Sequence, residues 1–173
     1  MNNELFGGIK IFKSEFFNDN RGSFREIYKK KILQNKNFIF HCLSISKKNV
    51  LRGLHIQTKF PQAKFLTVIK GEIFDVAVDL RKKSKTFGKF FSITLSNKSY
   101  SSIYIPEGFA HGFCCLRKEN IVYYCNSNYR DKKSETGIRW NDPDINIKWP
   151  IKNPILSVKD KNNLSLKQYY NNF

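Results

Sequence analysis

Short segments in which apolar and polar residues alternate constrain the fold of this chain most strongly. In the segment GEIFDVAVDL (71–80), Phe74 and Val76 alternate with Asp75 and Ala77, so the two pairs face opposite sides of a strand. Similar segments, separated by turn residues such as Pro106-Glu107-Gly108, cover residues 87–96, 101–109, 111–116 and 120–129. So many short strands at close spacing predict an all-β fold, a sandwich or barrel of the jelly-roll type.

Helical periodicity is weak along the whole chain. Only residues 30–37 and the tail after Asp160 have a pattern that predicts short helices. No linker, repeat or low-complexity segment divides the sequence, so we expect a single domain spanning residues 1–173. The tail from about residue 161 is polar, and we expect it to be mobile.

The net charge of +17 raises the question of a polyanionic partner. The lysines are spread along the chain, for example at 29–31, 81–85 and 131–133, whereas a nucleic-acid binder more often concentrates them in one patch. We therefore interpret the charge as a solvated basic surface and expect no nucleic-acid partner. A non-catalytic binder of polyanions or nucleic acid is the alternative from a different functional class.

The cysteines and the apolar segments indicate the cellular environment. The four cysteines show no CxxC spacing, and two of them are adjacent, which argues against a disulfide framework or a zinc site. The sequence shows no signal peptide and no apolar run of membrane-spanning length. We expect a soluble, cytoplasmic protein without a membrane partner.

Ionisable residues inside strand-like segments are the candidates for chemistry, because a barrel interior is otherwise apolar. The segment Leu51–Gln57, LRGLHIQ, carries His55 but no second histidine two residues later, so three-histidine metal ligation is not evident and we expect no metal. The candidates for inward-facing polar residues are Arg52, His55, Gln57, Lys64, Asp75, Asp79, His111 and Tyr123.

A histidine and a tyrosine that face one pocket can act as base and acid on opposite sides of a substrate. Lysine and arginine can neutralise a diphosphate or an enolate oxygen. The alternative is structural, because a strand histidine is often a hydrogen-bonded core or surface residue and a tyrosine is most often a packing residue. Residue spacing alone leaves both interpretations open.

Several motifs, in order along the chain, resemble one enzyme family. They are DNRGSFREIY (19–28), NVLRGLHIQ (49–57), PQAKFLTVIKGEIFDVAVDLRKKSKTFGKF (61–90), YIPEGFAHGF (104–113), YYCNSNY (123–129), ETGIRWNDPDINIKWP (135–150) and LSVKD (156–160). In this order they resemble the dTDP-4-keto-6-deoxyglucose (dTDP-4-dehydrorhamnose) 3,5-epimerases, cupin-type nucleotide-sugar epimerases of deoxysugar and surface polysaccharide biosynthesis. The resemblance runs nearly end to end.

The resemblance implies roles for individual residues. His55 matches the catalytic base, and Asp160 matches the acid that pairs with it. Tyr123 matches the residue that protonates the opposite face of the sugar, and Lys64 matches the lysine near the keto oxygen. The implied reaction inverts C3 and C5 of an NDP-4-keto-6-deoxy sugar through an enolate, and it uses no cofactor.

Further residues match family positions that bind the nucleotide-diphosphate sugar. The resemblance also implies a homodimer in which the early segment completes the site of the neighbouring subunit. The matching residues are Arg21, Phe24, Glu26, Arg52, His111, Tyr129, Glu135 and Lys159.

One segment departs from the family pattern. Where the family carries Q-x-N, this chain has Phe40-His41-Cys42, so Phe40 and Cys42 occupy substrate-contacting positions without an amide side chain. The sugar nucleotide is therefore left open between dTDP-4-keto-6-deoxyglucose and a GDP-linked 4-keto-6-deoxyheptose. A C3-only epimerase is the alternative enzyme.

Overall fold

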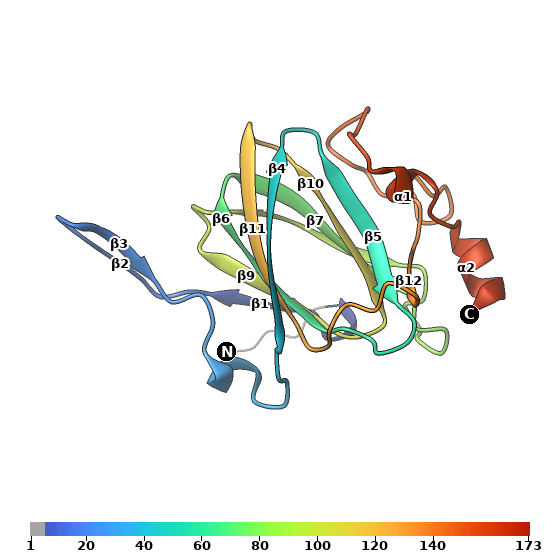
Figure 1. Cartoon of the computed structure of the whole chain (residues 1–173), viewed down its shortest axis with the longest axis horizontal. Helices are drawn as coiled ribbons and strands as arrows, with labels where there is room; N and C mark the ends of the chain where they lie inside the picture. Colours follow the sequence, from blue (N-terminus) through green and yellow to red (C-terminus); the bar gives the residue numbers. More distant parts are fainter. Residues whose placement is uncertain (1–5) are drawn as a thin grey trace.

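Two five-stranded antiparallel sheets face each other and form the barrel predicted from the alternating segments (Figure 1). The structure is a computed structural model that describes residues 6–173. One sheet has the order β1-β9-β6-β11-β4, and the other has the order β12-β5-β10-β7-β8. The first sheet contains β1 (Lys10–Lys13), β4 (Phe40–Lys47), β6 (Lys64–Lys70), β9 (Ser101–Ile105) and β11 (Glu119–Asn126). The second contains β5 (Leu51–Gln57), β7 (Glu72–Asp79), β8 (Phe90–Ser96), β10 (Phe109–Cys115) and β12 (Glu135–Gly137).

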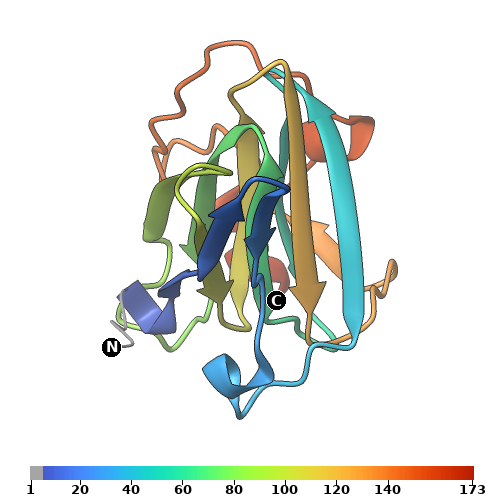
Figure 2. The same ribbon diagram turned by 90° about the vertical axis from the view of Figure 1, so that its left-hand side faces the viewer.

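The remaining elements are short, as the weak helical periodicity predicts. A separate hairpin, β2 (Phe16–Asp19) with β3 (Gly22–Arg25), projects away from the barrel (Figures 1 and 2). The helical elements are η1 (Phe6–Gly8), η2 (Lys30–Leu33), α1 (Val158–Lys161) and α2 (Leu166–Asn172). The prediction of an all-β jelly-roll fold with a few short helices is confirmed.

The alternation along β7 places its side chains in two separate cores. Ile73 and Ala77 pack in the core between the two sheets, together with residues such as Leu66 from the facing sheet. Val76 and Val78 face the opposite side of β7 and pack in a second core beneath the C-terminal segment. The second sheet is therefore buried on both faces, which explains why β7 contains so few exposed positions.

The C-terminal segment is folded rather than extended. Ser165 caps α2 with a capping box, and Tyr169 of this helix is only 6% exposed because it packs in the second core. The sequence predicted a short helix in the tail after Asp160, where α2 lies, but the expectation of a mobile tail from about residue 161 did not anticipate this packing. The tail is polar in composition, but its few apolar side chains are spaced to cover the outer face of the second sheet.

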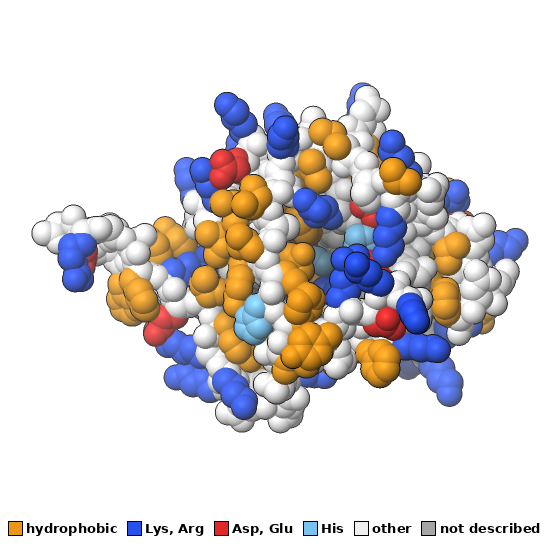
Figure 3. Space-filling view, in the orientation of Figure 1, with side chains coloured by type: hydrophobic (Ala, Val, Ile, Leu, Met, Phe, Trp, Pro, Cys, Tyr) orange, Lys and Arg blue, Asp and Glu red, His pale blue; other side chains and the backbone are white. Residues whose placement is uncertain are grey.

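The outer face of the first sheet carries exposed apolar side chains. Leu43 and Ile45 of β4 are 57% and 63% exposed, and their register partners on β11 are Tyr123 and Ile121. Figure 3 shows the resulting strip of hydrophobic side chains over β4 and β11. Apolar patches of this kind often mark interaction surfaces.

Candidate active site

His55 and Asp160 form a hydrogen-bonded pair at the inner wall of the second sheet. The distance between His55 Nε2 and Asp160 Oδ1 is 2.5 Å, and Asp160 is buried. Burial opposes ionisation of Asp160, but its hydrogen bonds with His55 and Ser157 hold its pKa below the ordinary value. An ionised Asp160 accepts the Nε2 proton of His55, which leaves Nδ1 of the neutral ring free to take a proton.

A bulge in β5 explains how Arg52 and His55 can share the inner side of the barrel although three positions separate them. In a regular strand such residues face opposite sides. Here His55 pairs with His111 and Arg52 pairs with Phe113, so β5 contains one extra residue. Gly53 has a φ of 120°, and a Cβ at this position would lie 2.5 Å from the Cα of Gly112. The glycine is therefore required for the bulge that brings Arg52 and His55 together.

Lys64 lies on the inner face of the first sheet. Its Nζ donates hydrogen bonds to Gln62 Oε1 at 3.0 Å and to Asn126 Oδ1 at 3.4 Å. Burial lowers the pKa of Lys64 to about 8, while the nearby groups of Glu135 and Cys42 act in the opposite direction. A poorly solvated ammonium group can stabilise a developing negative charge strongly.

The pKa of Lys64 predicts an alkaline limb in the rate of any reaction that needs its positive charge. The ammonium form dominates below a pH of about 8 and is lost as the pH rises through this value. We expect the pH–rate profile of the wild type to fall on this side. The profile of Lys64→Arg should lack this limb at reduced overall rate, because arginine stays charged. An unchanged alkaline limb in Lys64→Arg would assign it to another group.

The two adjacent tyrosines of β11 face opposite sides of the first sheet. Tyr123 OH lies 2.7 Å from His41 Nδ1, and its register partner Leu43 is on the exposed outer face. Tyr124 pairs with Leu66, which belongs to the core between the sheets, and with Cys42. Tyr124 therefore points to the inside of the barrel.

This arrangement corrects the prediction that Tyr123 lines the cavity. Successive side chains of a strand alternate between its two faces, so a shift by one residue exchanges inside and outside. Burial raises the pKa of Tyr124, with a further contribution from Cys42, so its hydroxyl keeps its proton at neutral pH. The sequence does not separate the two tyrosines, because an apolar residue stands two positions before each of them, Ile121 before Tyr123 and Val122 before Tyr124.

Glu135 organises the charged groups near His55. Its carboxylate lies 2.5 Å from Arg130 Nε and 2.7 Å from Lys159 Nζ. Burial opposes ionisation of Glu135, but the hydrogen bonds from Arg130 and Lys159 lower its pKa to about 2. The prediction for the site included Glu135 and Lys159 but missed Arg130, which lies outside any strand-like segment and gives no periodic signal.

Other predicted residues lie between β4, the edge strand of the first sheet, and β5 of the second sheet. Arg52 Nε donates to Ser46 Oγ at 2.9 Å, so this side chain crosses towards β4. Phe40 and Cys42 face inward, and the rings of Phe40 and Tyr129 are 6.0 Å apart between centroids. Figure 3 shows His, Lys and Arg side chains gathered around the opening between these two strands.

The hairpin residues do not reach the cavity of their own chain. Arg21 pairs with Asp19 at 2.6 Å on the exposed hairpin, and Phe24 is exposed. Glu26, just after β3, pairs with Lys29. These three predicted binding residues are separated from His55 because the hairpin projects away from the barrel (Figure 1).

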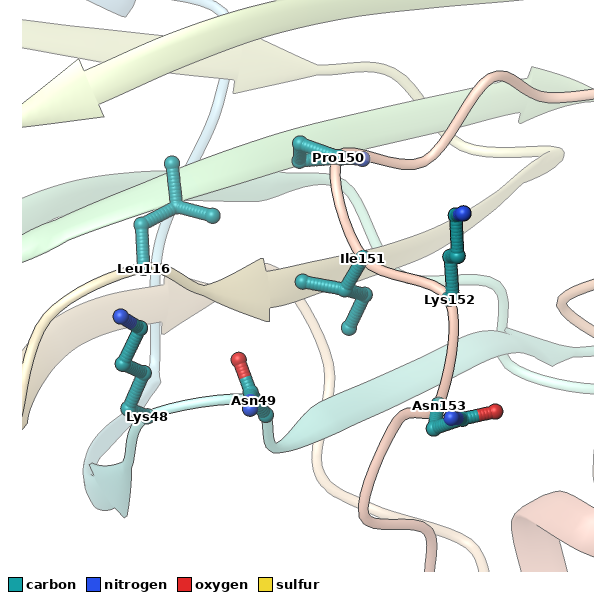
Figure 4. A pocket seen from close by; sticks show the side chains of 7 residues that line it. All are labelled: Lys48, Asn49, Leu116, Pro150, Ile151, Lys152 and Asn153. Atoms are coloured by element: carbon teal, nitrogen blue, oxygen red, sulfur yellow. The ribbon is translucent and has the colours of Figure 1, made fainter.

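A hollow of about 530 Å³ lies next to the residues that precede β5 (Figure 4). None of its lining residues is a histidine, tyrosine, cysteine or carboxylate, so it lacks the histidine–carboxylate pair found at His55. The lining residues are Lys48, Asn49, Leu116, Pro150, Ile151, Lys152 and Asn153.

Two negative findings apply to residues 6–173. Within this range, no group of three or more His, Cys, Asp or Glu side chains is arranged to hold a metal ion. Over the same residues, the structure contains no helix with the length and apolarity needed to cross a membrane.

The barrel and its interior residues define the class of protein, a jelly-roll barrel with a candidate acid–base site between its sheets. The family model for dTDP-4-dehydrorhamnose 3,5-epimerase matches residues 4–168. The chain belongs to this family.

Individual relatives agree with the family model. The dTDP-4-dehydrorhamnose 3,5-epimerase of Shigella flexneri is 44% identical over 160 residues, which cover 89% of this chain and 88% of the relative. The crystal structure of the Legionella pneumophila dTDP-6-deoxy-D-glucose-3,5-epimerase with dTDP-4-keto-L-rhamnose is 37% identical, with a TM-score of 0.88 over 92% of this chain and 88% of that one. The Mycobacterium tuberculosis epimerase is 31% identical, with a TM-score of 0.93 over 99% and 90% of the two chains.

Proposed function

We propose that this chain inverts C3 and C5 of dTDP-4-keto-6-deoxyglucose, with His55 as base and Tyr124 as acid. The observation that carries the proposal is their placement on opposite walls, since His55 lies on β5 of one sheet and Tyr124 on β11 of the other. Facing sheets lie about 10 Å apart, which allows a sugar ring to present one face to each residue. Epimerisation needs this arrangement, because the proton must leave one face and return to the other.

The chemistry follows from the 4-keto group of the sugar. The ketone acidifies the C–H bonds at C3 and C5, because the electron pair left behind delocalises onto the carbonyl oxygen. His55 Nδ1 takes the proton and Lys64 stabilises the enolate oxygen. Tyr124 then protonates the same carbon from the opposite face and recovers its proton from solvent, while His55 releases the proton it took to solvent. The same sequence at the second carbon gives the doubly inverted sugar, and no external electron acceptor is consumed.

Cationic and aromatic groups at the opening suit the nucleotide diphosphate. Arg52 offers a guanidinium group for phosphate oxygens, and Phe40 with Tyr129 offers aromatic surface for a base. The acid–base set inside the barrel supports an enzyme over a polyanion binder. A substrate of this kind also makes the cytoplasm the expected compartment.

The exposed apolar strip on the outer face supports a homodimer. Leu43 and Ile45 are large, apolar and exposed, and the hairpin carries Arg21 and Phe24 away from their own barrel. We infer that a second copy covers this face and that each hairpin, with Glu26 at its base, contributes to the partner's site.

A charge on the outer face should therefore separate the subunits. We expect Ile45→Glu to be monomeric in size-exclusion chromatography with light scattering, because dimerisation would bury the new carboxylate. Lys167→Glu on α2, away from the apolar strip, is the matched control and should remain dimeric. A dimeric Ile45→Glu protein would show that this face is not the interface.

The proposed function is tested by identifying the product. The protein is incubated with dTDP-4-keto-6-deoxyglucose and, separately, with a GDP-linked 4-keto-6-deoxyheptose, and ring-proton coupling constants are read by NMR. Inversion at C3 and C5 of the dTDP sugar is the expected result. Inversion of only the GDP sugar would reassign the substrate, and inversion at C3 alone would reassign the reaction. Absence of inversion with both sugars contradicts the proposal.

A further inference from the structure

A second histidine–carboxylate pair lies beside His55 inside the barrel. His111 Nε2 is 2.8 Å from Asp75 Oδ2. His111 is the register partner of His55 across β5 and β10, and directly opposed residues on one sheet face have Cβ atoms about 4.5–5.5 Å apart. The two imidazole rings are therefore neighbours on the same wall of the cavity.

The two residues of this pair differ in solvent exposure. The side chain of His111 is 10% exposed, whereas Asp75 is 1% exposed and is paired across the sheet with Phe113 and Ile93. Among the residues that the structure describes, Asp75 Oδ1 has no hydrogen-bond partner. Burying a carboxylate with so few hydrogen-bond partners costs free energy. Packing alone therefore does not explain why residue 75 is an aspartate. Within residues 6–173, the one hydrogen bond of its carboxylate is to His111, the register partner of His55.

We propose that Asp75 is a positioning residue that fixes His111 for substrate binding. A carboxylate can only accept, so Asp75 keeps the proton of His111 on Nε2 and holds the ring in one orientation. Nδ1 of His111 is then presented to the interior beside the catalytic base, where it accepts a hydrogen bond from a hydroxyl group of the sugar nucleotide. The inference rests on the proposed function for its substrate, but the arrangement of the ring can be measured without turnover.

The direct test is Asp75→Asn, which preserves the shape of the side chain but can also donate a hydrogen bond. Nitrogen-15 NMR of the histidine rings reports which nitrogen of His111 carries the proton. In the wild type we expect Nε2 to be protonated, and in Asp75→Asn we expect the proton to shift at least partly to Nδ1. If Nε2 of His111 is unprotonated in the wild type, or if its signals do not change in the variant, the proposal is wrong.

A double-mutant cycle separates positioning from a purely structural role. Asp75→Asn should lower kcat/KM by about 10- to 100-fold when His111 is present. In the His111→Gln background the same change should have no further effect, because Asp75 acts only through this ring. Equal losses in both backgrounds would show that Asp75 merely supports the fold.

The two measurements also keep this inference separate from the proposed function. If no 4-keto sugar is converted, the proposed function fails, while the ring spectra still decide whether Asp75 fixes His111. If Asp75→Asn does not fold, the wild-type spectrum alone remains decisive, because an unprotonated Nε2 would overturn the proposal.

Discussion

Replacing His55 with asparagine is expected to reduce epimerisation by about 10²–10⁴-fold, the usual contribution of a positioned general base. Asparagine can still donate to Asp160 from a similar place, but it cannot take a proton from carbon at neutral pH. The hydrogen bond at 2.5 Å between His55 and Asp160 is the observation behind this expectation. The measurement is kcat with dTDP-4-keto-6-deoxyglucose, followed by NMR.

His41→Asn is the matched control for this variant. His41 hydrogen-bonds Tyr123 and lies on the outer face of β4, so the same substitution removes an imidazole without changing the cavity. Light scattering should show that both variants keep the oligomeric state of the wild type. A His55→Asn enzyme that is as active as His41→Asn would remove His55 from the mechanism.

Removing the hydroxyl of Tyr124 is expected to have the second largest effect. Tyr124→Phe keeps the ring but removes the proton donor on the wall opposite His55, so formation of the inverted product should fall by about 10²–10⁴-fold. Proton removal by His55 does not need this hydroxyl. We therefore expect Tyr124→Phe to retain exchange of substrate protons with solvent while it forms little inverted product.

Tyr123→Phe provides a sharp comparison because the two tyrosines are adjacent. Its hydroxyl contacts His41 on the outer face of the first sheet, so its loss should leave the rate within a few-fold of the wild type. The ratio of inverted product to solvent exchange, measured for both variants, distinguishes the two residues. The assignment to Tyr124 is reversed if Tyr123→Phe loses inversion while Tyr124→Phe keeps it.

The sequence allowed the fold to be predicted because its main determinant is local. Alternation in segments such as 71–80 defines both faces of a strand, and the structure places Ile73 and Val76 in the two cores accordingly. A short helix was expected after Asp160, but its packing against the barrel was not. Its packing depends on contacts such as that of Tyr169 with the distant second sheet, and a polar local composition does not reveal these contacts.

A site residue could be predicted from the sequence where a family motif aligns with a single candidate residue. His55 and Asp160 are 105 positions apart, and only the resemblance to a family connected them before the structure showed their hydrogen bond. The pair Tyr123-Tyr124 contains two identical candidates, so a motif alone does not select the inward-facing one. Strand register decides this choice, because Tyr124 is paired with Leu66 of the inner core.

Other features of the site depend on three-dimensional geometry. The bulge at Gly53, which lets Arg52 and His55 share a side, has no signature in the alternating pattern beyond the glycine itself. The ion pair of Arg130 with Glu135 joins a loop to β12. The projection of the hairpin separates Phe24 from the cavity of its own chain, which no local pattern could have indicated.

The most direct test of the mechanism is proton exchange in deuterated water. The wild type is incubated with dTDP-4-keto-6-deoxyglucose, and loss of the C3 and C5 proton signals is followed by NMR. We predict deuterium at both carbons in the wild type, and exchange at neither carbon above the enzyme-free rate in His55→Asn. Exchange at neither carbon in the wild type, or full exchange in His55→Asn, would contradict the central claim that His55 removes protons next to the ketone.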